Sequence, residues 1–152
     1  MIKLKKQPLT ILIADDDEED RLLTQEALQE CEFPNVLVFA ENGEEALDYL
    51  MLRGKFSERK KHQLPHLILL DLNMPRKDGR EVLTEIRSNP LLKSIPVVAL
   101  TTSSAPEDIR KMYTLGVNSY ITKPVTFDEL VAAMRSLKQY WYDVVSLPDH
   151  DQ

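Results

Sequence analysis

The sequence predicts an α/β fold in which helices cover both faces of a doubly wound, five-stranded parallel sheet. The run Leu67-Ile68-Leu69-Leu70 is aliphatic without interruption, which is typical of a strand buried on both faces. Four further short apolar segments alternate with segments of helical periodicity, and this alternation indicates β-α units joined by right-handed crossovers. A length of 152 residues fits a single domain, residues 1–152, that needs no disulfide to complete its core.

The predicted strands are short, and polar or turn-forming residues follow each of them. We expect the flavodoxin-like order 2-1-3-4-5, counting along the chain, so that the first and third strands are neighbours. The last strand alternates polar and apolar residues, as an edge strand does. The strands are expected at residues 11–14, 36–40, 67–70, 97–100 and 119–122.

Five helices are expected to alternate with these strands. The first runs to about Cys31, the second follows Asn42-Gly43, and the third ends before Asn89-Pro90. The last two begin with capping-box spacing at residues 104–107 and 126–129. Gly116 is expected to end the fourth helix, and the fifth is expected to extend over residues 126–145. The inward residues of the fourth helix are expected to be Ile109, Met112 and Tyr113.

Composition argues against several classes of protein. The net charge of −6 disfavours nonspecific nucleic-acid binding, and no apolar run approaches the ~20 residues of a membrane span. The one cysteine, Cys31, is expected in the core, which favours a cytoplasmic compartment. Residues 1–8 lack the features of a signal peptide and are expected to form a flexible tail. Residues 53–65 are polar and basic, so they form either a solvated insertion or a partner-binding loop, and His62 and His66 have no ligand cluster beside them.

Reactive side chains follow four of the five predicted strands. Asp15 and Asp16 follow the first, Asp71 the third, Thr101 the fourth and Lys123 the fifth. Taken alone, Asp71 could be a helix cap or a solvated turn residue. However, the carboxyl ends of parallel strands meet at one edge of the sheet, so we expect one crevice to hold all these groups.

The chemistry of this crevice indicates a cation and a phosphoryl group. Crowded carboxylates repel one another unless a cation joins them, and their oxygens suit Mg²⁺, with Mn²⁺ as a possible substitute. A lysine and a hydroxyl that face the metal complete a site for a phosphoryl group. Competing motifs are absent: there is no glycine-rich nucleotide loop, and the glycine and glutamate of an EF-hand do not follow Asp71. An aspartyl-phosphate phosphatase would be expected to carry a second acid at position 73, where this chain has Asn73.

These motifs resemble the receiver domain of two-component response regulators over roughly residues 9–140. The residues that carry the resemblance are Asp15-Asp16, Asp71-Leu72-Asn73-Met74-Pro75, Asp78-Gly79, Thr101, Tyr120 and Lys123-Pro124. Residues 64–66, 79–83, 95–103 and the aromatic segment 140–148 are most similar to single-domain response regulators that partner bacterial and cyanobacterial phytochrome histidine kinases.

The resemblance implies a role for each of these positions. Asp71 would be the nucleophile that takes a phosphoryl group from a kinase phosphohistidine. Asp16 would bind Mg²⁺ directly and Asp15 through a water, while Asp71 and the backbone carbonyl of Asn73 would complete the protein ligands. Asp17 is more simply a helix-start acid, favoured there by the helix dipole.

The same resemblance implies a conformational switch. Lys123 would pair with Asp71 and later with a phosphoryl oxygen. Thr101 would move in to hydrogen-bond the phosphoryl group, and Tyr120 would follow into the space that Thr101 leaves. Tyr120 could otherwise be an ordinary aromatic of an edge strand. A cis peptide bond before Pro124 is expected to aim the lysine.

Three functions remain in competition at this point. The first is a Mg²⁺-dependent phosphorelay switch, not an enzyme beyond its own phosphotransfer and autodephosphorylation, with a histidine kinase as partner, no membrane contact, and no DNA binding in cis. The second is an aspartyl-phosphate phosphohydrolase, and the third is a pseudo-receiver that only docks partners. Asn73 argues against the second, and the complete acid pair with Lys123 argues against the third.

The last helix suggests a homodimer. Its apolar residues follow four-three spacing, the pattern of a helix that packs on another helix. The distal end is expected to extend beyond the domain and to leave an apolar patch exposed. The alternative is that the tail folds back onto its own domain. The residues of this spacing are Leu130, Met134, Leu137, Trp141 and Val144.

Overall fold

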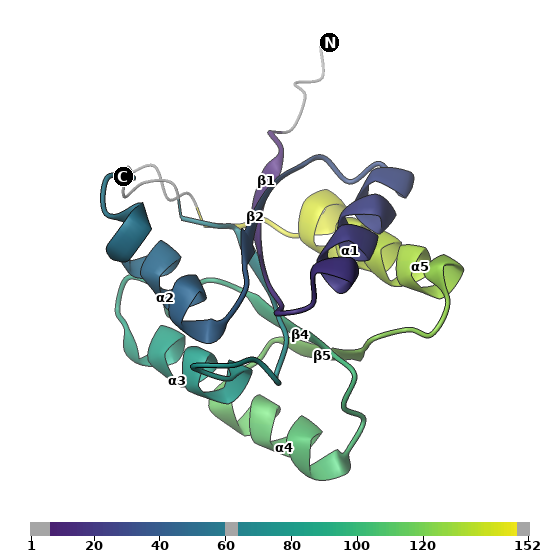
Figure 1. The fold of residues 1–152 in the computed structure, drawn as a ribbon. Helices are drawn as coiled ribbons and strands as arrows, with labels where there is room; N and C mark the ends of the chain where they lie inside the picture. Colours follow the sequence, from purple (N-terminus) through teal and green to yellow (C-terminus); the bar gives the residue numbers. More distant parts are fainter. Residues whose placement is uncertain (1–6, 60–63, 149–152) are drawn as a thin grey trace.

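All five strands lie in one parallel sheet with the order β2-β1-β3-β4-β5 (Figure 1). The computed structural model describes residues 7–59 and 64–148. Its strands are β1 Leu9–Ala14, β2 Asn35–Ala40, β3 Leu67–Leu70, β4 Val97–Thr101 and β5 Ser119–Thr122. The predicted fold class and strand order are confirmed, and each predicted strand overlaps an observed one.

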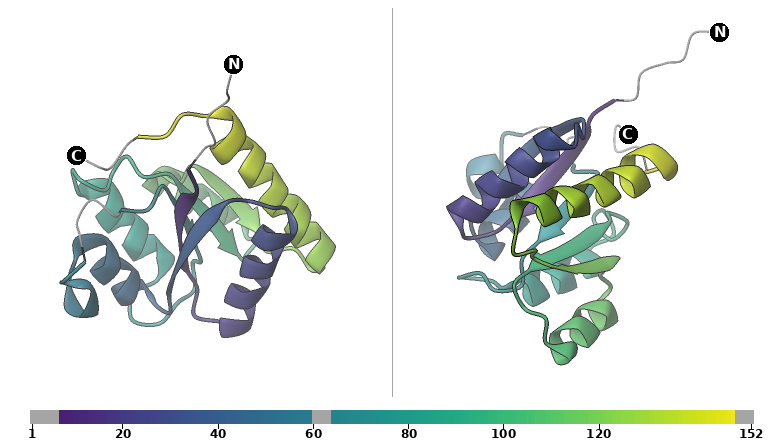
Figure 2. Two further views of the ribbon diagram at one scale, coloured as in Figure 1. Left: turned by 90° about the horizontal axis from the view of Figure 1, so that it is seen from above. Right: turned by 90° about the vertical axis from the view of Figure 1, so that its right-hand side faces the viewer.

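The helices form a layer on each face of the sheet. Helices α1 and α5 lie side by side on one face, and α2, α3 and α4 follow one another across the other (Figures 1 and 2). A 3₁₀ turn, η1 Gly54–Phe56, follows α2, and a π-helical segment, η2 Lys138–Val144, continues α5. The helices are α1 Glu18–Glu30, α2 Gly43–Met51, α3 Gly79–Ser88, α4 Pro106–Leu115 and α5 Phe127–Leu137.

The two helical layers explain why β3 is aliphatic at every position and why β1 is almost entirely so. In β1, Ile11 and Ile13 pack toward α1 and α5, whereas Leu12 and Ala14 pack toward the other layer. All four residues of β3 are buried in the same alternating way. Since neither face of the inner strands meets water, no polar residue interrupts the run.

Helix α4 differs from its predicted form. It begins at Pro106 with Ala105 as the N-cap and has no side-chain capping bond, so the expected capping box at residues 104–107 is wrong. Proline has no backbone N–H group, so Pro106 leaves one amide fewer to be capped in the first turn. This explains how α4 begins without a side-chain capping bond. Met112 is fully buried, but Tyr113 is 49% exposed, because α4 packs on only α3 and β5 and buries a narrow stripe. Gly116 ends the helix at a φ of 105°, as expected.

Helix α5 begins close to its expected form. The Thr126 hydroxyl accepts a hydrogen bond from the Glu129 amide at 3.2 Å, which is half of the expected capping box. The Glu129 carboxylate lies 3.0 Å from the Thr126 hydroxyl, so the glutamate is engaged by that side chain. Together, α5 and η2 extend the helix to Val144, next to the expected end at residue 145.

The end of this helix is only partly exposed, which corrects the expectation of a free distal patch. Leu130, Met134 and Leu137 are buried against the sheet, and Trp141 packs at the edge of the same core. The Tyr142 ring lies 5.8 Å from the Phe33 ring, centroid to centroid. Trp141 and Tyr142 therefore fold back onto their own domain.

The described part of the 53–65 segment is docked on α2. The Phe56 ring meets the Tyr49 ring edge-on at 5.2 Å, and the Arg59 guanidinium lies 3.8 Å from the centre of the Tyr49 ring. Residues 60–63, which include His62, lie outside the described residues. His66 Nδ1 accepts a hydrogen bond from the Thr10 amide at 3.0 Å, so it serves the structure of the chain.

Cys31 is buried, as expected. Among the described helices, none is both long enough and apolar enough to cross a membrane.

Candidate metal and phosphoryl site

Three carboxylates meet at the carboxyl edge of the two central strands. Ala14 pairs with Leu70 in the parallel register, which places Asp15 and Asp71 side by side just beyond the strands. The Asp71 amide donates to the Ala14 carbonyl at 3.0 Å, so the ladder extends to the site itself. One carboxylate oxygen from each of Asp15, Asp16 and Asp71 lies within 4.8 Å of the others.

The environment of this cluster fits a divalent cation. Asp15 and Asp71 are 4% and 7% exposed, whereas Asp16 faces solvent and leaves the cluster open to an incoming ion. Burial raises the pKa of Asp15, although the hydrogen bond from Lys123 opposes that rise. A cation bound among the three carboxylates would supply the favourable interactions that water supplies to an exposed carboxylate. Oxygen-only donors with an open side suit a hard metal ion that keeps part of its water shell.

Lys123, at the end of β5, is the cation nearest to this cluster. Its Nζ lies 2.7 Å from Asp15 Oδ2, 2.7 Å from Asp20 Oδ2 and 3.3 Å from Asp71 Oδ2. Burial alone would lower the pKa of Lys123, but the hydrogen bonds to Asp15 and Asp20 and the charge of Asp71 outweigh it and raise the pKa. The ammonium is therefore a fixed positive charge beside Asp71.

The peptide bond before Pro124 is trans, because the described residues contain no cis peptide bond, and the expectation of a cis bond is wrong. The lysine is aimed by other contacts. Its own amide donates to the Thr101 carbonyl at 2.7 Å, which ties the end of β5 to the end of β4. The carboxylates around Nζ then fix the side chain.

Thr101 is the last residue of β4 and is buried at the same edge of the sheet. It is 0% exposed, and its Oγ1 has no hydrogen-bond partner among the described residues. A buried hydroxyl without a partner costs roughly 1–3 kcal/mol. This hydroxyl is thus ready to bond to an acceptor that enters the crevice.

Behind Thr101, a chain of polar contacts joins the β4–α4 loop to three elements. The Tyr120 hydroxyl donates to the Ser103 carbonyl at 2.8 Å. The Ser103 hydroxyl donates to Asp108 Oδ2 at 2.5 Å, and Arg80 of α3 donates to Asp108 Oδ1 at 2.7 Å. The Tyr120 hydroxyl is therefore bonded to the loop that follows Thr101.

The loop that follows Asp71 is tightly constrained. Asn73 is exposed at its start, and Asp78 caps α3 in a reciprocal capping box with Glu81. The Gly79 amide donates to the Leu72 carbonyl at 2.7 Å. A Cβ at Gly79 would lie 2.9 Å from Leu72 Cα and closer still to the Asp71 carbonyl oxygen, so glycine allows α3 to begin against the backbone of the site.

The structure brings the sequence-predicted Asp15, Asp16, Asp71 and Lys123 together, and it adds two residues of α1 that the sequence analysis did not single out. Asp20 was not singled out, yet it reaches Lys123 from the first turn of the helix. Arg21 Nη1 donates to the Asp15 carbonyl at 2.6 Å and fixes the helix against the site. Asp17 caps the helix through the amides of Glu19 and Asp20, as expected for a helix-start acid.

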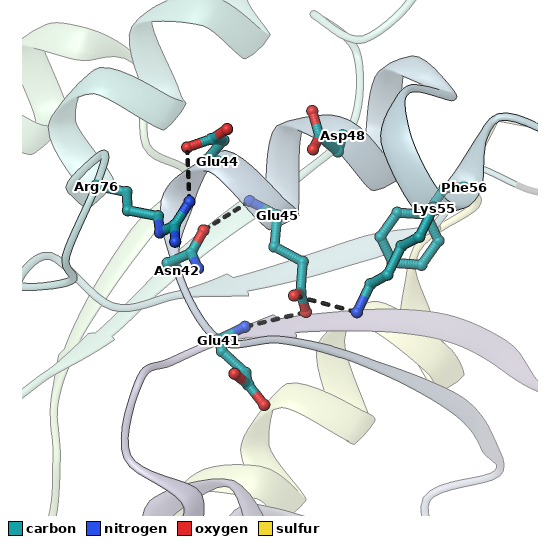
Figure 3. A pocket seen from close by; sticks show the side chains of 8 residues that line it. All are labelled: Glu41, Asn42, Glu44, Glu45, Asp48, Lys55, Phe56 and Arg76. Carbon is teal, nitrogen blue, oxygen red and sulfur yellow. Dashed lines mark hydrogen bonds and ion pairs between the residues drawn. The ribbon is translucent and has the colours of Figure 1, made fainter.

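Figure 3 shows a second polar hollow, over the first turns of α2. Three of its four acids are paired: Glu45 with Lys55 at 3.2 Å, Glu44 with Arg76 at 3.5 Å and Asp48 with Arg53 at 3.3 Å. Because these pairs offset most of the negative charge of the hollow, the strand-end cluster is the better candidate for a metal.

Comparison with known proteins agrees with this geometry. Residues 11–135 match the family model of the response regulator receiver domain, so the chain belongs to that family. It is related to phytochrome response regulators in particular. Response regulator Rcp1 of Synechocystis sp. is 40% identical over 93% of this chain and 94% of its own length.

Solved structures give the same result. The phosphorylated cyanobacterial phytochrome response regulator RcpA has a TM-score of 0.85 and 42% identity, and the match covers 93% of this chain and 99% of that one. The Mn²⁺-bound form of Rcp1 has a TM-score of 0.83 and 40% identity over the same shares. This chain is therefore a receiver-domain response regulator, a family whose members act as phosphoacceptors rather than as conventional enzymes. Its acidic cluster is compatible with a divalent metal such as the one bound in Rcp1.

Proposed function

We propose that Asp71 accepts a phosphoryl group from the phosphohistidine of a sensor kinase and that the resulting acyl phosphate switches the conformation of this protein. The observation that carries the proposal is the convergence of Asp71 with two further carboxylates, a lysine and an unpartnered buried hydroxyl. A carboxylate oxygen of Asp71 would attack phosphorus, forming the P–O bond as the P–N bond of the phosphohistidine breaks. The ionised carboxylate has no proton to lose, and the departing imidazole takes one from water.

The residues that would hold the metal are Asp16 and Asp71 directly, Asp15 through a water, and the backbone carbonyl of Asn73. We propose Mg²⁺ as the ion, since it retains several waters and needs few protein ligands. When bound, it supplies positive charge that offsets the repulsion between carboxylates and phosphoryl oxygens. The open side at Asp16 supports this assignment, because a hydrated ion and a phosphodonor both need access.

The remaining residues would respond to the phosphoryl group. Lys123 already lies 3.3 Å from Asp71, so its ammonium would pair with a phosphoryl oxygen after transfer. The Thr101 hydroxyl would donate to another oxygen, which requires the β4–α4 loop to move toward Asp71. Tyr120 bonds the carbonyl of Ser103 in that same loop, so movement at Thr101 would reach the surface around β5. The same site would catalyse the slow hydrolysis of the acyl phosphate on Asp71, since water can approach from the exposed side.

The partner that we propose is a histidine kinase of the phytochrome type, on the basis of the names of the relatives. Such kinases draw on ATP, so we place the reaction in the cytoplasm. We propose no direct contact with DNA or with a membrane. A phosphohydrolase remains the less favoured alternative because Asn73 occupies the position where a second acid would be expected. A pseudo-receiver is disfavoured because the three carboxylates of the cluster and the lysine beside them are all present.

Intact mass spectrometry tests this proposal. With acetyl phosphate and Mg²⁺, the wild-type protein should gain the mass of one phosphoryl group, and Asp71→Asn should not. Omission of Mg²⁺ should abolish the gain in the wild type. A gain of equal size in Asp71→Asn would overturn the assignment, and sustained release of phosphate from a phosphorylated metabolite would favour the hydrolase.

We also propose a homodimer that forms through the C-terminal helix and tightens on phosphorylation. A groove of about 470 Å³ runs beside α5 and η2, lined in part by Ile121, Ala133 and Leu137. Tyr140 also lines this groove and is 54% exposed, and Val144, further along η2, is 72% exposed. Because Trp141 and Tyr142 pack on their own domain, the dimer would use Tyr140 and Val144, a smaller patch than the helical spacing suggested.

A further inference from the structure

Asp20 is a fourth carboxylate at the site, and it contacts only the lysine there. Its Oδ2 lies 2.7 Å from Lys123 Nζ, as close as Asp15 and closer than Asp71 at 3.3 Å. Yet Asp20 is not part of the group of three carboxylates that could share a metal ion. Its side chain is 32% exposed, compared with 13% for Lys123, so it closes the solvent side of the lysine.

The backbone of Asp20 is held in place from both directions. Its amide donates to the Asp17 side chain at 3.3 Å, and its carbonyl accepts a hydrogen bond from the Thr24 hydroxyl at 2.9 Å. The neighbouring Arg21 ties the same turn to the Asp15 carbonyl at 2.6 Å. The first turn of α1 therefore presents the Asp20 carboxylate to the site from a fixed position.

The donors of Lys123 are fully used by these contacts. An ammonium group has three N–H donors, and three carboxylates surround this one. A cation and a phosphoryl group would take up oxygens of Asp15 and Asp71. Asp20 would then be the remaining carboxylate that holds the lysine, because it lies outside that cluster.

We propose that Asp20 is a positioning residue, which acts through Lys123 and keeps its ammonium directed at Asp71 while the other two carboxylates are engaged by the metal and the phosphoryl group. This inference rests on the proposed role of Asp71. Without Asp20, the lysine keeps its charge but loses a fixed anchor on its exposed side. The Lys123 side chain then has to lose its rotational freedom at each phosphoryl transfer, and this entropic cost slows the reaction.

The test compares Asp20→Ala with Glu19→Ala, which removes the same charge from the same exposed turn without contacting Lys123 in the structure. With acetyl phosphate at saturating Mg²⁺, Asp20→Ala should slow acyl-phosphate formation on the order of tenfold, the size expected for a hydrogen bond between charged groups. Asp20→Ala should lower the maximal rate of acyl-phosphate formation. The acetyl phosphate concentration that gives half of the maximal rate should stay the same. Asp20→Glu should restore part of the rate, and Glu19→Ala should match the wild type.

A second readout does not depend on phosphorylation. The ¹⁵N-correlated NMR signal of the Lys123 ammonium should be visible in the wild type, because three acceptors slow its proton exchange, and should broaden or vanish in Asp20→Ala. Mn²⁺ affinity, measured by calorimetry, should stay within a few-fold of the wild type, since Asp20 is outside the carboxylate cluster. An unchanged ammonium signal in Asp20→Ala, or an equal loss of rate in Glu19→Ala, would overturn the inference. If the wild type takes no phosphoryl group at all, the proposed function fails, while the NMR comparison still decides whether Asp20 anchors Lys123.

Discussion

At the scale of single residues, the site combines groups that repel one another with one group that offsets the repulsion. Asp15 and Asp71 are buried side by side, and Lys123 is the positive charge between them. Removal of one carboxylate would thus have two opposite effects, because it relieves repulsion but also removes a ligand. Asp16 separates these effects, since it is exposed and Lys123 pairs instead with Asp15, Asp20 and Asp71.

Asp16→Ala should therefore lose most of the affinity for Mg²⁺, and phosphoryl transfer with it. Its stability should hardly change, because exposed substitutions usually lie within about ±0.5 kcal/mol. Calorimetric titration with Mg²⁺ and thermal unfolding measure the two effects. Wild-type Mg²⁺ affinity in the mutant would contradict the ligand assignment.

At the scale of elements, the β4–α4 loop links the site to α3, α4 and β5. Thr101 lies at its start, Ser103 bonds both Tyr120 and Asp108, and Arg80 reaches Asp108 from α3. A hydrogen bond to a charged phosphoryl oxygen contributes roughly 1.5–3 kcal/mol, similar to the gap between two conformers of a switch. The proposed new bond at Thr101 would thus be comparable in free energy to the shift of the loop.

Thr101→Ala should still accept the phosphoryl group, because Asp71 and the acids are intact, but should shift poorly to the active conformation. Amide NMR spectra recorded with and without a stable acyl-phosphate mimic, such as beryllofluoride, measure this shift near Tyr120. Thr102→Ala, at the exposed neighbouring position, is the matched control. Equal chemical-shift changes around Tyr120 in Thr101→Ala and the wild type would remove Thr101 from the coupling.

The anchor of this loop should also depend on pH. Hydrogen bonds from Ser103 and Arg80 hold the pKa of Asp108 below its ordinary value, so the folded protein favours the ionised carboxylate. Its contribution to stability is therefore complete above the unfolded pKa of about 3.8 and is lost as the pH falls through the lower folded value. The difference in unfolding free energy between the wild type and Asp108→Asn should shrink as the pH falls below about 4. A difference that grows toward acid pH would contradict this sign.

The elements also show what local sequence could and could not predict. The strands and the strand-end residues followed from short apolar runs, because burial on both faces leaves a local pattern. The contact between Asp20 and Lys123 joins residues 103 positions apart, so no local pattern indicates it. The start of α4 was misjudged because two residues, Ser104 and Ala105, could each take the cap position before Pro106. No spacing of apolar residues in the sequence distinguishes the π-helical form of η2 from a continued α-helix.

At the scale of the whole molecule, the two helical layers have different surfaces. The layer of α1 and α5 carries the aromatic tail, and Tyr140 meets the Trp141 ring edge-on at 4.9 Å while remaining half exposed. Half-burying an aromatic of about 200 Å² contributes roughly 2–3 kcal/mol, whereas association costs about 4–15 kcal/mol. A modest dimer is consistent with these magnitudes, and an obligate dimer is not.

Tyr140→Asp together with Val144→Asp should weaken self-association by at least tenfold without unfolding the domain, since both side chains are exposed. Sedimentation of the wild type and the double variant, each with and without beryllofluoride, measures this effect. Exposed Tyr113→Asp, on α4, serves as the control. Matching monomer profiles for all samples would exclude the dimer.

The central claim is that Asp71 carries the phosphoryl group, and reductive trapping tests it most directly. Borohydride reduces an acyl phosphate on an aspartate to homoserine, which peptide mass spectrometry locates in the chain. After treatment with acetyl phosphate and Mg²⁺, we expect homoserine at position 71, with Asp15 and Asp16 unchanged. Homoserine at another acid, or none in a protein that has gained a phosphoryl group, would contradict the claim.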